Sequence, residues 1–515
     1  MTSPLQRLAE SIGLQLEWTR PGEARVECRE DDFFDLATAL SGPCVIGDLF
    51  ATTLAGSPPR LTAVFAAAGD PAWLLLTTTL HAESFTSLTP ALHAASWYER
   101  EIFEMHGLEP LGHPALSPLR LHDWQERHHP MRRGFEAAER LPHPPHGVRR
   151  PSVTGQGVFQ LPLGPVRSGP QESAEFLFSS GGEDIVEVDI RLGFKYRAME
   201  ARAEGLAVED VALLAERVAG VSSFANGLGF ITAVENALGV EVGPTDQAAR
   251  TLLAELERLH HHLGVIGRLA EATGLLVASA QYGILKEEVL RTGGRLTGHR
   301  YLRGALRVGG LHARLDEPAC QQLRTQLEVW RTRAERLRQL LEHTATFRDR
   351  LEGTAILNPG YAAEHSLVGP VGRGSGIDRD CRRDHPYQAY GAVEFQVPTE
   401  IDGDAEARFR VHAREVGQSL SIMLQLLDRW RDGERSSGQA ARRSGSALGW
   451  AEAPGGETLH WVEIDQEGRV VRWRARTPAV VNWHPYAHAC GSGNNLTDYP
   501  VIEASFSLSA AEFDR

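Results

Sequence analysis

The five cysteines of the chain could supply thiolate ligands, but their spacing does not form a ligand pair. They are Cys28, Cys44, Cys320, Cys381 and Cys490. Zinc sites and iron–sulfur clusters use cysteines a few residues apart, because side chains on one short loop can reach the same metal. No two of these five are close in sequence. We therefore expect reduced thiols, as in a cytosolic protein, and no metal held by a cysteine pair.

Three consecutive histidines, residues 260–262, lie in a segment with helical spacing. Consecutive side chains on a helix point about 100° apart, so three adjacent rings cannot all face one metal ion. We predict a mixture of exposed and packed histidines rather than a metal site.

Residues 120–150 are rich in arginine and histidine, although the whole chain has a net charge of −14. The favoured interpretation is a solvated loop, and the alternative is a docking strip for an acidic partner subunit. The overall negative charge argues against general nucleic-acid binding, because nothing neutralises phosphate over the whole surface.

The chain has 515 residues, which is too long for one ordinary core, so we expect at least two domains. Residues 1–140 alternate between helical and strand-like patterns, which predicts a small α/β domain. Expected helices cover residues 5–14, 31–40 and 88–106, and expected strands cover 16–28, 61–66 and 73–78. Residues 141–155 predict a linker, since their prolines cannot continue a helix.

Residues 156–515 predict a mainly helical second domain with small sheets, so the fold class is α+β. Expected helices cover residues 207–218, 245–273, 281–296, 317–351 and 405–430, and expected strands cover 157–163, 185–192, 458–464 and 470–475. No stretch reaches the roughly 18–20 uninterrupted apolar residues of a membrane span. The beginning of the chain has no continuous apolar core of signal-peptide type.

Several segments of the first domain resemble the C-type subunit of respiratory complex I. They are residues 97–108 (WYEREIFEMHGL), 112–114 (GHP) and 129–134 (HPMRRG), in the order that this family has. The resemblance implies that the domain packs against a D-type subunit and an iron–sulfur subunit. Taken singly, the charged residues of 97–108 have a simpler interpretation as the charged face of a helix.

The rest of the chain resembles the D-type subunit of complex I and, more closely, the large subunit of membrane-bound group 4 nickel–iron hydrogenases. The matching segments are residues 163–169 (LGPVRSG), 215–226 (AERVAGVSSFAN), 256–262 (LERLHHH), 296–300 (LTGHR), 369–376 (GPVGRGSG), 382–387 (RRDHPY) and 498–515. The fused order is similar to that of formate hydrogenlyase large subunits. The resemblance implies a hydrogenase large-subunit-like fold for the second domain.

Nickel–iron hydrogenases hold their metals with two Cys-x-x-Cys pairs, because soft thiolates suit both ions. In the first motif this chain has Ala219 and Ser222, and Asn226 replaces a histidine of the family. In the second motif it has Ser509 and Glu512. Alanine cannot bind a metal, hydroxyls stay protonated near neutral pH, and a carboxylate is a hard ligand. We expect no nickel–iron centre and no directly bound cofactor; a residual hard-metal site at Glu512 is the alternative to a solvated or paired carboxylate.

The quinone site of complex I D-type subunits is incomplete by the same comparison. The family's histidine loop corresponds to residues 164–171, which contain Arg167 but no histidine. Its tyrosine position falls near Gly220, and no tyrosine occurs between Tyr196 and Tyr282. A quinone is therefore possible here only with non-standard ligands, among which Arg167 is a candidate.

Two charged residues remain candidates for catalysis. Glu172 lies near the position of a proton-gating glutamate in the hydrogenase pattern, and a desolvated carboxyl group can pass protons. Its alternative interpretation is a surface glutamate. Arg373 falls in the loop that borders the family's active cleft, where a guanidinium could hold an anion. Its alternative interpretation is a structural ion pair with Asp378 or Asp380.

Tyr196 and Arg197 occupy the position of a His-Arg pair that borders the partner's terminal iron–sulfur cluster in the family. The resemblance makes them candidates for contact with that cofactor, and ordinary interface packing is the alternative.

Taken together, the resemblance implies a subunit of a membrane-associated, ion-translocating oxidoreductase complex that is not itself a hydrogenase. It would be peripheral, on the cytoplasmic face of the membrane, and would bind an iron–sulfur subunit that carries the cluster and contacts the membrane subunits. The alternatives are quinone reduction with non-standard ligands and a non-catalytic scaffold that holds neighbouring subunits.

Overall fold

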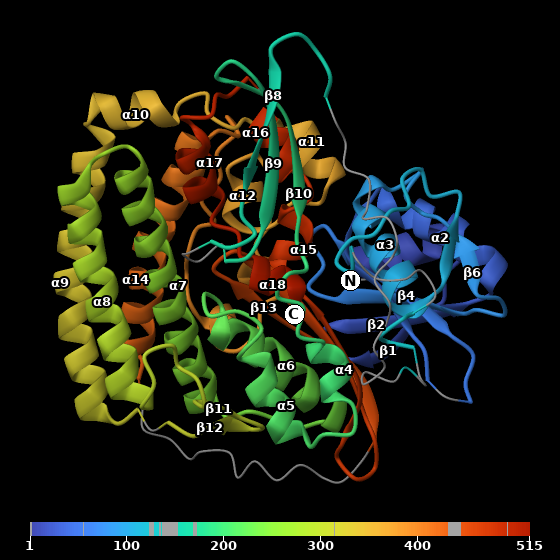
Figure 1. Cartoon of the computed structure of the whole chain (residues 1–515). Helices are drawn as coiled ribbons and strands as arrows, with labels where there is room; N and C mark the ends of the chain where they lie inside the picture. Colours follow the sequence, from blue (N-terminus) through green and yellow to red (C-terminus); the bar gives the residue numbers. More distant parts are fainter. Residues whose placement is uncertain are drawn as a thin grey trace.

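The computed structural model describes residues 3–54, 56–122, 128–132, 135, 153–167, 172–313, 315–430, 444–491 and 493–515. Within these, a small sheet domain lies on one side, a bundle of long helices on the other, and two small sheets between them (Figure 1). This confirms the α+β class. The predicted linker, residues 141–155, lies outside the described residues except for 153–155, so the domain boundary stays a prediction.

The N-terminal domain is built on a five-stranded sheet. Its strands, in spatial order, are β1 (Glu17–Arg20), β2 (Glu23–Cys28), β5 (Trp73–Thr79), β4 (Arg60–Ala67) and β3 (Cys44–Thr52). The segment 16–28, expected as one strand, is a hairpin because Gly22 adopts φ +83° in the turn between β1 and β2. Sequence periodicity does not reveal β3, because the apolar run is interrupted at Gly47, where the strand has a bulge between Ile46 and Asp48.

Helices and a small ribbon surround this sheet. They are α1 (Pro4–Ser11), α2 (Glu30–Ser41), the 3₁₀ helix η1 (His93–Ala95), α3 (Ser96–His106) and the paired strands β6 (Ser84–Thr86) and β7 (Glu109–Leu111). The helix expected over residues 88–106 begins only at Ser96 and ends at Gly107, whose φ of +70° closes the helix.

Four long helices form the bundle on the opposite side of the molecule (Figure 1). They are α7 (Pro244–Ala272), α8 (Leu276–Thr297), α9 (Glu317–Glu342) and α14 (Ala405–Asp428). Their periodic apolar stripes predict them well, although α9 ends nine residues earlier than expected and α10 (Ala345–Leu351) continues as a separate helix. The sequence does not reveal α6 (Ser223–Leu238), because this helix is buried on nearly every side and has no polar face to set a period.

Two three-stranded antiparallel sheets lie between the bundle and the N-terminal domain. One contains β8 (Val158–Leu163), β9 (Glu175–Gly181) and β10 (Asp184–Arg191), and the other contains β13 (Gly445–Ala453), β14 (Gly456–Ile464) and β15 (Val470–Arg476). Helix α6 packs on β13 and β14.

Shorter elements connect these layers. They are α4 (Met199–Ala203), α5 (Val208–Ala215), β11 (Leu306–Arg307), β12 (Gly310–Leu311), α11 (Pro359–Glu364), α12 (Gly369–Arg373), α13 (Cys381–Asp384), η2 (Tyr390–Ala392), α15 (Pro478–Asn482), α16 (Tyr486–Gly491), α17 (Tyr499–Phe506) and α18 (Ala510–Asp514). None of the helices in the described part of the chain combines the length and apolar character that crossing a bilayer requires.

The N-terminal sheet and the β13–β15 sheet share one hydrophobic core. The ring of Phe50 on β3 lies 5.4 Å from that of Trp461 on β14. Beside this core, Asp48 accepts hydrogen bonds of 3.0 and 2.8 Å from Arg474 on β15. The two parts of the chain are therefore joined by a buried interface with both apolar and ionic contacts.

Glu101 on α3 is the central acceptor of this interface. It accepts hydrogen bonds from Arg120 at 2.6 Å and Arg474 at 2.7 Å, and a third from Arg515. Burial disfavours its charge, but the three guanidiniums hold the pKa of Glu101 well below its ordinary value. Arg120 is 3% exposed, so it is not part of a solvated loop. Residues 123–127, 133–134 and 136–150 of the basic stretch lie outside the described residues.

We expect Glu101→Ala to lower the free energy of unfolding by about 3–5 kcal/mol, because three buried guanidiniums lose their shared carboxylate. Urea denaturation of the purified chain measures this change. Glu109→Ala, at an exposed position on β7, is the control and should change stability by less than about 0.5 kcal/mol. Equal effects of the two substitutions would contradict the role given to Glu101.

Candidate functional site

The two segments that the resemblance assigns to metal ligands lie side by side. The first is the turn between α5 and α6, and the second contains the start of α18. Arg197 joins them: its guanidinium donates hydrogen bonds to the carbonyl oxygens of Arg217 and Val218, both at 2.8 Å, and of Ala511 at 2.7 Å. Arg197 thus fixes the position of one segment relative to the other.

Ser222, Ser509 and Glu512 meet where these segments touch. The Ser222 hydroxyl donates to Glu512 Oε1 at 2.5 Å, and Asn226 Nδ2 donates to Ser222 Oγ at 2.9 Å. Ser509 is the N-cap of α18 and accepts from the Glu512 amide at 3.3 Å. Ala219, on the same turn, is buried. All of these side chains are therefore engaged with one another or packed against protein.

These residues do not fit a binuclear nickel–iron centre. Ser222 and Ser509 use their oxygens in hydrogen bonds within the protein, and the methyl group of Ala219 offers no ligand atom. The cavity beside them has a volume of about 20 Å³ and is lined in part by Ser222, His261, His412 and Glu512. It has room for about one water molecule.

Glu512 has a pKa close to neutral pH. Burial raises its pKa to about 7, although hydrogen bonds from Ser222 and Asn226 act in the opposite direction. Glu257 on α7 is a second such carboxyl: burial raises its pKa to about 8, with a further contribution from Glu512. The backbone amides of Phe224 and Ala225 donate to Glu257 at 2.6 and 2.9 Å. The site therefore contains two buried carboxyl groups that can release a proton in the physiological range.

A hydrogen-bonded chain runs from the cavity into the core. His412 Nδ1 lies 2.8 Å from His262 Nδ1, and His262 Nε2 lies 2.9 Å from Glu415 Oε2. Burial lowers the pKa of both histidines, so both rings are neutral. A neutral His262 that donates from Nε2 to the carboxylate must accept at Nδ1, so His412 donates from Nδ1. The Nε2 lone pair of His412 then has no hydrogen-bond partner among the described residues.

The structure corrects the prediction for residues 260–262, since all three histidines are buried. They point to different neighbours, as helix geometry requires. His260 packs against Tyr301, with ring centroids 6.0 Å apart, while His261 lines the cavity and His262 contacts Glu415. The absence of exposed rings reflects the position of α7 between α8, α14 and α17.

Arg373 lies at the inner end of the His412–His262–Glu415 chain. It is fully buried and pairs with Glu415 at 2.7 Å, Glu452 at 2.9 Å and Asp380 at 3.4 Å. Asp378 instead pairs with Arg383 at 2.6 Å. This geometry favours the structural ion pair with Asp380 over an anion site in an open cleft.

The other predicted site residues lie away from the cavity. Arg167 pairs with Glu503 at 2.6 Å, and Glu172 pairs with Lys195 at 3.3 Å. The Tyr196 hydroxyl lies 3.7 Å from the sulfur of Met105, and burial raises its pKa above the ordinary range. Within the described part of the chain, neither these residues nor Arg197 or Arg373 line the cavity. Sequence comparison thus locates Ser222 and Glu512 but misses Glu257, His262 and His412, although the His412–Glu415 spacing of three on one helix is a usable signal.

A larger pocket adjoins the cavity and shares Val221 and His261 with it. Its volume is about 690 Å³, which is the size of a pocket for a small organic molecule. Four basic side chains line it, and one acidic side chain, Glu271, accompanies them. The basic residues are Arg268, Lys286, Arg300 and Arg303. Burial, together with Arg268 and Arg300, lowers the pKa of Lys286.

The chain combines an N-terminal sheet domain, a helical core, and two neighbouring segments at the positions of the hydrogenase metal ligands. This combination is typical of the subunits that complex I and the nickel–iron hydrogenases share. Residues 27–141 match the family of the respiratory-chain NADH dehydrogenase 30 Kd subunit, and residues 275–444 match that of the 49 Kd subunit. Formate hydrogenlyase subunit 5 of Escherichia coli is 32% identical over 85% of this chain and 78% of its own length. The chain belongs to the family of these fused subunits.

One further relative and one solved structure are also similar to this chain. Hydrogenase-4 component G of Escherichia coli is 32% identical over 84% of this chain and 76% of its own length. A subunit of the membrane-bound sulfane sulfur reductase, an archaeal respiratory membrane complex, has the same fold, with a TM-score of 0.66. The two chains are 24% identical, and the match covers 71% of this chain and 100% of that subunit.

Proposed function

We propose that this chain is a peripheral subunit of a membrane-associated, ion-translocating oxidoreductase complex and that it holds no nickel–iron centre. The Ser222–Glu512 hydrogen bond of 2.5 Å is the observation that carries the proposal. It joins two positions at which the hydrogenase pattern has thiolates, and it leaves a carboxyl and a hydroxyl that are poor ligands for soft metals.

The remaining parts of the proposal rest on the relatives. Because they are subunits of hydrogenases, NADH-quinone oxidoreductases and a respiratory membrane complex, we infer an iron–sulfur subunit as the direct partner. That partner would carry the terminal cluster and contact the membrane subunits. The chain would then lie on the cytoplasmic face of the membrane without a span of its own.

Metal analysis of the purified complex tests the proposal. We expect iron in the amount that the partner's clusters require and nickel far below one atom per chain, with a nickel–iron hydrogenase prepared in parallel as the positive control. One nickel atom per chain, bound between the α5–α6 turn and α18, would overturn the proposal.

A second candidate function is the reduction of a small organic acceptor, such as a quinone, held by residues other than the usual quinone ligands of the family. The 690 Å³ pocket favours it, because Val221 and His261 line both that pocket and the cavity beside Glu512. Two electrons would come, one at a time, from the partner's cluster. Glu512 would supply one of the two protons that a quinone takes up, and water in the pocket would supply the other. The basic lining suits an acceptor that carries or develops negative charge.

A further inference from the structure

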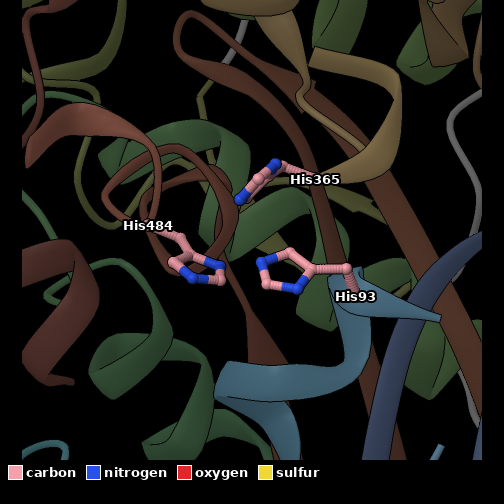
Figure 2. Close-up of side chains that lie close together, drawn as sticks. All are labelled: His93, His365 and His484. Carbon is pink, nitrogen blue, oxygen red and sulfur yellow. The ribbon is translucent and has the colours of Figure 1, made fainter. Parts of the chain in front are cut away.

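Three histidines from three separate segments gather at the interface of the two parts of the chain (Figure 2). His93 belongs to η1 of the N-terminal domain, His365 follows α11, and His484 follows α15. One ring nitrogen from each lies within 4.8 Å of the others. The ring centroids are 4.6 Å apart for His93 and His365, 4.7 Å for His365 and His484, and 5.1 Å for His93 and His484.

The hydrogen bonding of this cluster leaves a lone pair on each ring. His365 Nδ1 donates to the carbonyl oxygen of Tyr361 at 2.9 Å, so its Nε2 is unprotonated and available. Such a bond on the second nitrogen is how metal-binding histidines are usually oriented. Neither ring nitrogen of His93 or His484 hydrogen-bonds to protein in the described part of the chain.

The rings of His365 and His484 are also held in place and kept neutral. His484 stacks on Trp97, with centroids 4.9 Å apart, and His365 stacks on Tyr361 at 4.1 Å. Burial, with the neighbouring histidines, lowers the pKa of His484 to about 2, and burial lowers that of His365 to about 4. Neutral imidazole is the form that binds a metal ion.

We propose that His93, His365 and His484 form a binding site for a divalent transition metal, Zn²⁺ in the first instance, which joins the N-terminal domain to the helical domain. Three imidazoles and one water make a common zinc ligand set. With Zn–N distances of about 2.0–2.1 Å, the three nitrogens would lie about 3.4 Å apart. The three nitrogens lie within 4.8 Å of one another, so each pair would have to approach by up to about 1.4 Å to bind the ion.

The proposed site is separate from the cavity beside Glu512, since none of its three histidines lines that cavity. The bound ion would connect residues that are 391 positions apart in sequence, His93 and His484. It would therefore act as a clamp between the domains, and its presence does not depend on the proposed function of the complex.

The experiment is a Zn²⁺ titration of the full-length chain after treatment with EDTA, in competition with a chromophoric chelator, and a Co²⁺ titration read by its ligand-field absorption. We expect one Zn²⁺ per chain, and an affinity at least about tenfold weaker in each of the variants His93→Gln, His365→Gln and His484→Gln. Zn²⁺ should also raise the Tm of the wild-type chain but not of these variants.

Two controls make the result specific. His488→Gln removes an exposed histidine near the cluster, whose ring stacks on Tyr361 at a centroid distance of 4.4 Å. This variant should bind Zn²⁺ like the wild type. Glu512→Gln should also bind normally, which separates this site from the cavity. His93 is exposed on a short 3₁₀ helix, so its variant is expected to fold even if the variants of the buried His365 and the half-buried His484 do not. No saturable uptake by the wild type, or equal uptake by His93→Gln, would overturn the proposal and leave a stacked aromatic cluster.

Discussion

Glu512→Gln is expected to lower turnover of the assembled complex by about 10²–10⁴-fold, the range that a positioned proton donor contributes. Glutamine keeps the shape of the side chain and can accept the Ser222 hydrogen bond, but it has no acidic proton. Because Glu512 lines the cavity where the two ligand-position segments meet, the loss would affect chemistry at the cavity without removing the fold. Steady-state turnover of the purified complex measures the effect.

The pH profile gives this prediction a direction. The pKa of Glu512 is raised to about 7 in the folded chain, so the carboxyl is protonated below that pH and loses its proton as the pH rises. Turnover that depends on it should be highest below pH 7 and fall above it. The same shift contributes stability below the ordinary pKa of a glutamate, and this contribution is lost as the pH passes through 7.

A matched substitution separates the chemical role from a general effect of charge. Glu317→Gln changes an exposed residue at the beginning of α9 and should leave both turnover and its pH profile unchanged. If Glu512→Gln supports full turnover with an unaltered pH profile, the cleft is not a site of proton transfer. The scaffold interpretation would then be the better account of the chain.

Arg373→Met is expected to lower the free energy of unfolding by about 3–5 kcal/mol, the cost of leaving buried charges without their partner. Burial opposes the charge of Glu415, but Arg373 and the hydrogen bond from His262 hold its pKa well below the ordinary value. Without the guanidinium, Glu452 loses its ion-pair partner, while Glu415 keeps Arg258 at 3.8 Å and Asp380 keeps Arg382 at 2.6 Å. Guanidinium chloride denaturation of the purified chain provides the measurement.

Arg383→Met is the control for this substitution. Arg383 pairs with Asp378 and Asp384 at 2.6 and 2.7 Å, but its side chain is 39% exposed, so the loss should not exceed about 1 kcal/mol. Arg373→Lys keeps a positive charge and should recover part of the stability. A change below about 1 kcal/mol for Arg373→Met would return Arg373 to the candidates for a functional role.

The sequence predicts the structure well where a local pattern, such as an apolar stripe or a motif, determines the outcome. The apolar stripe of α7 predicts Pro244–Ala272 to within one residue at each end, and the motif comparison brings Ser222 and Glu512 together although 290 positions separate them. It fails where burial decides the outcome. Helix α6 has no polar face because protein surrounds it, and the proton affinities of Glu257 and Glu512 depend on neighbours from other segments.

The same limit explains why some predicted site residues do not lie at the cavity. Arg373 occupies a loop next to the family's cleft, but its neighbours Glu415 and Glu452 come from α14 and β13, which no local motif reveals. Arg197 follows the opposite course. The sequence leaves two interpretations of Arg197, which are contact with the partner's cluster and ordinary interface packing. Its hydrogen bonds to both ligand-position segments are visible only in the structure.

The shared core of the N-terminal sheet and β13–β15 sets an order on folding during synthesis. The ion pair between Asp48 and Arg474 cannot form until Arg474, 426 residues later in the chain, has been synthesised. At ribosomal rates of about 5–20 residues per second, that delay is roughly 20–85 seconds. Throughout it, the residues of the first sheet that pack on β13–β15, such as Phe50 against Trp461, lack that partner. The nascent chain is therefore a candidate client for a chaperone that covers hydrophobic strands, and a truncation before β13 would make that exposure permanent.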